Sequence, residues 1–443
     1  MEHCTWKTSI GTFIGNEREG CYEFRGIPYA HAKRFEYAEN VHSYGDSFDA
    51  TSNGPATMQK RAWSEFEHLE IPERAFYHRE FREGIAFTYD EDALLMNIFV
   101  PKDKGPHPVI VYFHGGGFDS GSISESPFDG EALASRGNVV VFVQYRVAIF
   151  GYFTHAEIEK RNGHDGNFGL DDMVQSLKWV QDHIAEFKGD KDNVTLMGQS
   201  AGAMSIQYLL CSPKATGLFH KAVMMSGAGL FPSFSLPLSP EQTRIYWSEV
   251  MDIAGAKTFE EFQSMDVRKV MEAVETQKSR RKDNTRNTMP VVDHYYLIDE
   301  VKKIIKSPHE MPLIIGVTNN DMFTAIIAHI AKKYAKKHGA YLYYFDVDAK
   351  GDENQAFHSS DLRYMFGTLK SSWRPYDETD QKISESMMDY LSAFASTGDP
   401  NHEGAPRWDK FQGKALHIAP SSIGMGRMGN WKLLKNTLKG DPK

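Results

Sequence analysis

The chain has 443 residues, of which 41% are hydrophobic and 25% are charged, which is enough apolar material for one large α/β domain or two average domains. The formal net charge of −9 argues against a nucleic-acid partner and against a general attraction to anionic membrane surfaces, because both carry negative phosphates. Two basic runs, 278–286 and 332–337, are interpreted as a solvated loop and a solvated helix face.

The cysteines and the absence of targeting signals indicate the compartment. Cys4, Cys21 and Cys211 cannot all pair, and their spacing matches no metal site. No signal-peptide pattern opens the sequence, and no apolar stretch reaches the roughly 18 residues that cross a bilayer. We therefore expect a cytoplasmic protein with reduced thiols, no membrane span and no metal.

Short apolar runs rich in β-branched residues recur along the chain and predict strands buried on both faces. They lie at 97–100, 109–113, 139–143, 194–197, 222–225, 313–317 and 341–345. Helices are expected between them, at 171–187 and 383–395 among others, whereas 40–90 and 228–310 are less regular. This alternation predicts an α/β fold in a single domain over 1–443, with a central, mostly parallel, twisted sheet flanked by helices.

A glycine triplet directly follows the predicted strand 109–113, in the segment His114-Gly-Gly-Gly-Phe118. No side chain screens the backbone N–H groups of such a segment, so two of them can point at one oxygen atom. The alternative is a flexible turn after a buried strand. We expect His114 itself to brace the loop rather than to act as an acid or a base.

The segment Gly198-Gln-Ser-Ala-Gly202 lies between a predicted strand and a predicted helix. In a nucleophile elbow the serine occupies a sharp, strained turn, and a Cβ atom at either glycine would collide with the neighbouring strand or helix. The turn would project the Ser200 hydroxyl beyond the sheet and place the backbone N–H of Ala201 at a helix N-terminus. By itself the pattern would occur by chance about 0.2 times in such a chain, so the prediction depends on the strand-turn-helix context.

Together with further motifs, these segments resemble the type B carboxylesterase family, which includes the cholinesterases and neuroligin. The matching motifs are FRGIPYA at 24–30, EDALLMN at 91–97, GNFGL at 166–170 and TGDPN at 397–401. Their order and approximate spacing agree from residue 20 to about 225. The resemblance implies an α/β-hydrolase fold, a small-molecule ester substrate and no cofactor, and it leaves the oligomeric state open.

The resemblance also implies site residues. Ser200 matches the nucleophile, Gly116, Gly117 and Ala201 match the donors of the oxyanion hole, and His358 matches the catalytic histidine.

The acid has two candidates. Asp321 stands where the family places a glutamate after an IIGV strand, and Asp361, three residues past His358, is the alternative. Ser226 matches a family serine beside the acid, which favours Asp321.

Three departures from the family pattern modify these expectations. Ala93 replaces a disulfide cysteine, which agrees with an intracellular protein. Gln199 replaces the glutamate before the nucleophile, and no tryptophan precedes Glu91 where cholinesterases stack choline, so choline esters are disfavoured. Only 37 residues separate Asp321 from His358, with one amphipathic helix between them (Ile326, Ile327, Ile330 and Tyr334 inward), which predicts a more open, promiscuous site.

The sequence therefore predicts a carboxylic ester hydrolase that acts through an acyl-enzyme on Ser200. Two alternatives remain: a catalytically weak or inactive binding, sequestering or adhesion homologue, and a lipase or amidase that uses the same residues.

Overall fold

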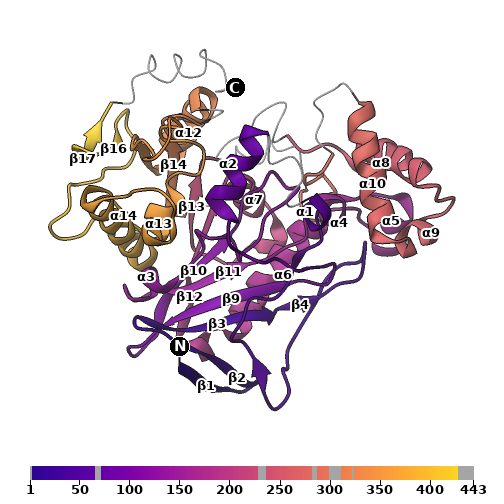
Figure 1. The fold of residues 1–443 in the computed structure, drawn as a ribbon, viewed down its shortest axis with the longest axis horizontal. Helices are drawn as coiled ribbons and strands as arrows, with labels where there is room; N and C mark the ends of the chain where they lie inside the picture. Colours follow the sequence, from indigo (N-terminus) through magenta and orange to yellow (C-terminus); the bar gives the residue numbers. More distant parts are fainter. Residues whose placement is uncertain are drawn as a thin grey trace.

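A large mixed sheet forms the centre of the computed structural model, which describes residues 2–64, 71–227, 236–281, 287–298, 311–321 and 324–427 (Figure 1). Its strands in spatial order are β1 (Glu2–Thr8), β2 (Gly11–Glu17), β3 (Cys21–Pro28), β9 (Leu95–Pro101), β11 (Val139–Val143), β10 (His107–Phe113), β12 (Gly189–Gln199), β13 (Lys221–Met225), β14 (Leu313–Thr318), β15 (Tyr341–Phe345), β16 (Ala415–Ala419) and β17 (Ser422–Gly426). Neighbours from β11 through β16 pair in parallel, and the other neighbours in this order pair antiparallel. A short strand, β6 (Phe48–Asp49), adds to β2 in parallel. All seven strands predicted from the sequence are confirmed.

Helices cover both faces of this sheet, because its central strands are apolar on both sides. Val109 and Val111 of β10 join a core formed with α6 (Phe168–His183), α7 (Ala201–Leu209) and α12 (Thr324–His338). Ile110 and Tyr112 join the opposite core with α3 (Glu131–Ala134), α13 (Leu362–Phe366) and α14 (Glu378–Thr397). The predicted fold class, a mostly parallel sheet between helices, is confirmed.

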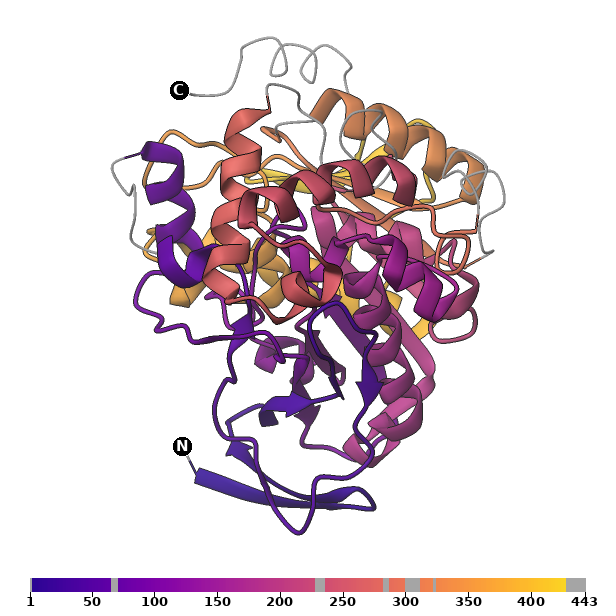
Figure 2. The same cartoon turned by 90° about the vertical axis from the view of Figure 1, so that its right-hand side faces the viewer.

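A third helical group lies to one side of the sheet. It contains α8 (Pro240–Ala254), α9 (Phe259–Ser264) and α10 (Val267–Arg280), which share a separate core with α4 (Ala148–Tyr152) and α5 (Ala156–Asn162) (Figure 1). The expectation of irregular structure over 228–310 is wrong for this part. Figure 2 shows these helices toward the end of the molecule opposite the N-terminal strands.

Residues 40–90 hold mainly short elements, as expected. These are β5 (Glu39–Asn40), β6 (Phe48–Asp49), β7 (Ala56–Thr57), α1 (Arg61–Ser64), α2 (Pro72–Phe81) and β8 (Tyr89–Asp90), and β4 (Ala30–His31) precedes them. The helix predicted between Asp321 and the strand at 341–345 is α12, but the side chains of Ile326, Ile327 and Ile330 lie outside the described residues. In the described part of the chain, no helix combines the length and the apolar composition that a membrane span requires.

Candidate active site

Ser200 occupies a strained turn between β12 and α7. Its φ of 55° and ψ of −122° are unusual for a residue with a side chain, and its N–H donates to the Met225 carbonyl at 2.9 Å. A Cβ atom at Gly202 would lie 2.1 Å from the Phe113 carbonyl oxygen, and one at Gly198 would lie 2.7 Å from the carbonyl carbon of Gly202. The predicted need for both glycines is confirmed. The turn places the Ser200 side chain at the carboxyl edge of the parallel strands.

The glycine triplet follows β10 and lies beside this turn, because Phe113 and Gly198 are paired in the sheet. Gly116 and Gly117 have φ values of 113° and 65°, and a Cβ atom at Gly116 would lie 1.9 Å from the Ser120 carbonyl oxygen. Only glycine fits these conformations without strain. The loop therefore requires glycine at these positions.

His114 is completely buried and stacks on Tyr145 with ring centroids 4.3 Å apart. The Tyr145 hydroxyl donates to the His114 carbonyl at 2.6 Å. Burial lowers the pKa of His114 to about 4, so the ring is neutral near pH 7. This environment agrees with a bracing role for His114.

His358 and Asp321 are brought together by two neighbouring parallel strands. Asp321 follows β14, and His358 lies in the loop beyond β15. An isolated parallel bridge joins Asn320 to Phe357, and the Asn320 N–H donates to the Ala356 carbonyl at 3.0 Å. The residues that follow each side of this bridge are therefore adjacent, and the His358 Nδ1 atom lies 3.0 Å from Asp321 Oδ2.

This contact orients the imidazole ring. Its Nδ1–H donates to the Asp321 carboxylate, which leaves Nε2 as the acceptor, and the Gln199 side-chain amide lies 3.1 Å from Nε2. Burial opposes the charged form of the ring, but the Asp321 carboxylate and the more weakly acting Asp361 carboxylate together outweigh this effect, so the pKa of His358 is raised above its ordinary value. The arrangement supplies a base whose unprotonated nitrogen, Nε2, contacts Gln199, the residue before Ser200.

Asp361 has a different set of contacts. It is completely buried and accepts a hydrogen bond from the Tyr343 hydroxyl at 2.7 Å. Burial raises the pKa of Asp361 to about 6. The described hydrogen bonds of His358 include one to Asp321 and none to Asp361, so the geometry favours Asp321 as the partner of the ring.

A cavity of about 330 Å³ connects these groups. It is lined by seven of the predicted or neighbouring site residues, namely Gly115, Gly116, Gly117, Gln199, Ser200, Ser226 and His358. Ala201 and Asp321 are buried behind this surface. Within the described residues the Ser226 hydroxyl has no hydrogen-bond partner, so its placement beside the acid stays a prediction.

Sequence reasoning did not identify the outer wall of the cavity. Arg61 lies in α1, and Tyr77 and Phe81 lie in α2, far from Ser200 in the sequence; all three line the cavity. No motif marks them, because only tertiary packing brings α1 and α2 to this cavity.

One group of side chains in the described part of the chain could hold a metal ion, and it contains His42, Asp182 and His183. His183 ends α6, which precedes β12, so this group lies at the edge of the sheet opposite Ser200. It has no place in chemistry at the cavity.

Comparisons with known proteins identify the family and the fold of the chain. The model of the carboxylesterase family matches residues 3–332 and 322–428. Para-nitrobenzyl esterase of Bacillus subtilis is 28% identical over 93% of both chains, and carboxylesterase 5A of Felis catus is 29% identical over 88% of this chain and 84% of its own. A solved structure of a PNB esterase superposes with a TM-score of 0.83 at 24% identity, over 98% of this chain and 99% of that one, which confirms the predicted α/β-hydrolase fold.

Proposed function

The chain belongs to the carboxylesterase family and is a carboxylic ester hydrolase, and from this premise we propose that it acts through an acyl-enzyme on Ser200. In this proposal His358 is the general base and Asp321 orients it. The observation that carries the proposal is the 3.0 Å contact between His358 Nδ1 and Asp321 Oδ2, with Nε2 beside the Gln199 amide and with His358 lining the same cavity as Ser200.

Each group has one role in the proposed first step. His358 Nε2 accepts the proton of the Ser200 hydroxyl as Oγ attacks the ester carbonyl carbon. The developing imidazolium is stabilised by the Asp321 carboxylate. The N–H groups of Gly116, Gly117 and Ala201 donate to the oxyanion, and His358 then returns its proton to the departing alcohol, which leaves an acyl-enzyme.

Water completes the cycle. His358 removes a proton from a water molecule as the water oxygen attacks the acyl carbonyl, and it gives this proton to Ser200 Oγ as the carboxylic acid is released. Gln199 donates to Nε2 in the resting structure, so its amide must yield that nitrogen to Ser200 before the first step. An uncharged residue at position 199 also supplies no attraction for cationic alcohols, so we propose that choline esters are poor substrates.

A fluorophosphonate probe tests the proposal directly. We expect the probe to label Ser200, with the adduct located by peptide mass mapping, and we expect Ser200→Ala and His358→Ala to abolish labelling. Ser205→Ala is the matched control, because the Ser205 hydroxyl is buried in α7 and donates to the Ala201 carbonyl. A folded protein that the probe does not label would instead support a non-catalytic binding homologue.

We also propose a cytoplasmic location. All three cysteines, Cys4, Cys21 and Cys211, are free. This supports a compartment in which thiols stay reduced. Recovery of the active protein from a secreted fraction of its source cells would contradict it.

A further inference from the structure

Three side chains that can coordinate a metal ion converge where α6 ends, away from the catalytic cavity. His42, Asp182 and His183 each offer one ligand atom, and these atoms all lie within 4.8 Å of one another. Asp182 and His183 belong to the last turn of α6, whereas His42 lies in the segment between β5 and β6. An ion held by all three would therefore join two segments that are far apart in the chain.

The protein makes no other use of these three groups. Within the described residues, the His183 Nε2 atom is buried and has no hydrogen-bond partner. The structure also gives the His42 ring and the Asp182 carboxylate no hydrogen bond or ion pair with any described residue. The two imidazole rings lie against each other with centroids 5.8 Å apart. Their nitrogens and the carboxylate are thus free to bind an ion.

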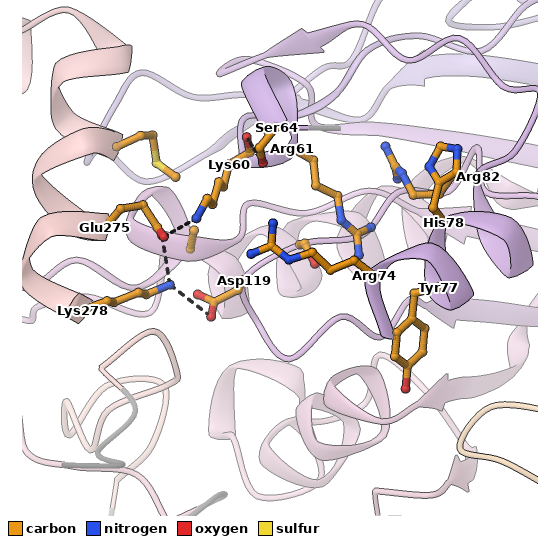
Figure 3. A pocket seen from close by; sticks show the side chains of 13 residues that line it. Lys60, Arg61, Ser64, Arg74, Tyr77, His78, Arg82, Asp119, Glu275 and Lys278 are labelled. Atoms are coloured by element: carbon orange, nitrogen blue, oxygen red, sulfur yellow. Dashed lines mark hydrogen bonds and ion pairs between the residues drawn. The ribbon is translucent and has the colours of Figure 1, made fainter. Parts of the chain in front are cut away.

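A contrasting arrangement is present in a cavity of about 420 Å³ that adjoins the catalytic cavity (Figure 3). There Lys60 pairs with Glu275 at 2.5 Å, and Lys278 lies 3.4 Å from Asp119. These charged side chains serve one another, which the group at the end of α6 does not. Lys278 belongs to the last turn of α10 and not to a solvated loop, which corrects that expectation, whereas 282–286 lie outside the described residues.

The backbone on both sides of His42 is held against α6. The Asn40 side chain donates to the Gln175 carbonyl at 2.9 Å, and the Trp179 indole N–H donates to the Tyr44 hydroxyl at 2.8 Å. Both partners belong to α6. Because anchors lie two residues before and two residues after His42, little further ordering is needed when an ion binds.

From this arrangement we infer that His42, Asp182 and His183 bind a zinc ion, which clasps the segment 41–47 to the end of α6. Two imidazole nitrogens and one carboxylate oxygen are ligands that zinc accepts, with a water molecule as the fourth. Magnesium and calcium instead prefer oxygen ligands alone. The carboxyl end of a helix also favours a cation.

The distances fit zinc after a small adjustment. An ion at the centre of three atoms within 4.8 Å of one another is at most about 2.8 Å from each, and zinc takes these ligands at about 2.0–2.2 Å. Movements of less than about 1 Å therefore close the site, and His42 and Asp182 are exposed and can make them. Cysteine spacing gave no sign of this site, since it contains no cysteine.

The alternative is a chance approach of three surface side chains. In that case zinc would bind no better here than at any exposed histidine, and the loss of one member would leave the binding of zinc unchanged. Comparison of single substitutions is therefore the informative measurement.

Calorimetric titration of the untagged, metal-free chain with zinc chloride provides the test. We expect one zinc ion to bind at this group, and we expect His42→Gln and Asp182→Asn each to weaken this binding by at least about tenfold, since even the loss of an outer partner of a metal ligand costs that much. His31→Gln is the matched control, because His31 is also exposed and lies 2.8 Å from a carboxylate, that of Asp92. A titration curve that neither His42→Gln nor Asp182→Asn changes would overturn the inference, whatever other site takes up zinc.

Thermal unfolding gives an independent measurement. An ion that binds only the folded chain should raise the Tm of a chain of this length by about 3 °C at a hundredfold excess over its Kd. We expect zinc to produce this rise in the parent and in His31→Gln, and magnesium at the same concentration not to. An equal rise in His42→Gln would overturn the inference, as would no rise in the parent. The labelling of Ser200 tests the proposed function separately, and the inference does not depend on its result.

Discussion

The contact between Gln199 and His358 makes a quantitative prediction for the substitution Gln199→Glu. The Gln199 amide nitrogen lies 3.1 Å from His358 Nε2, where it donates to the neutral ring and so favours the uncharged form. A carboxylate at the same place would reverse the sign of this interaction. In an effective dielectric of about 20, the attraction between a carboxylate and an imidazolium at that distance is about 5 kcal/mol before desolvation is subtracted.

Desolvation reduces this figure, because the side chain at position 199 is only 3% exposed. Opposite charges this close raise a pKa by about 1 to 3 units, which corresponds to about 1.4 to 4 kcal/mol. The pKa of His358 is already raised by Asp321, and the new carboxylate would raise it further. Because the neutral ring is the base, activity falls when the ring becomes protonated. As the pH is lowered, the variant should therefore lose activity at a higher pH than the parent enzyme does.

The assay is the pH profile of kcat/KM for a neutral 4-nitrophenyl ester. We expect the acidic limb of the Gln199→Glu profile to move to higher pH by about 1 to 3 units. Gln199→Met is the control, because it removes the amide without adding charge. The same acidic limb in both variants would refute the reasoning, since His358 would then not be the base or residue 199 would not face Nε2 in the working enzyme.

Three further predictions concern the acid and the elbow. Asp321→Asn should lower kcat for ester hydrolysis by about 10⁴-fold, because the carboxylate that orients His358 is lost. Asp361→Asn should lower kcat far less, and equal losses in the two variants would contradict the assignment of Asp321. Gly202→Ala should reduce the free energy of unfolding by about 1–3 kcal/mol, measured by denaturant unfolding, because the new Cβ atom would meet the Phe113 carbonyl. Gly424→Ala is the control, because its Cβ atom has open space around it, and it should leave the free energy of unfolding unchanged. Because burial raises the pKa of Asp361 from 3.8 to about 6, the folded protein binds a proton there more tightly than the unfolded chain does, so this group costs stability as the pH rises through that range. The free energy of unfolding of Asp361→Asn, measured in urea, should therefore increase relative to that of the parent as the pH rises from about 4 to about 6. A difference between the two proteins that stays constant over this pH range would contradict the prediction.

The central strands and the elbow could be predicted from the sequence because their signals are local. Five-residue apolar runs such as Val139–Val143 bury both faces, and the strand-turn-helix context identifies Ser200 within a few residues. The sequence also carries local signals for the ends of helices α8 and α10. Ser239 and Gln242 form a capping box before α8, Gly255 ends that helix in a left-handed conformation, and Asp266 caps α10.

The outer wall of the catalytic cavity could not be predicted in this way. Arg61 of this wall donates to Glu125, which is 64 residues away in the chain. Only tertiary packing brings α1 and α2 to the cavity that Ser200 lines, so sequence patterns contain no direct sign of these residues.

The short route from Asp321 to His358 illustrates why chain length is a poor guide to the geometry of a site. Only 37 residues separate the two, and this spacing by itself predicts a more open site. A crossover between adjacent parallel strands requires about a dozen residues or more, and α12 provides 15 between β14 and β15. The register of these strands, together with the bridge from Asn320 to Phe357, then sets the 3.0 Å contact. The pairing of the histidine with its carboxylate therefore depends on the ends of two adjacent strands and not on the number of residues between them.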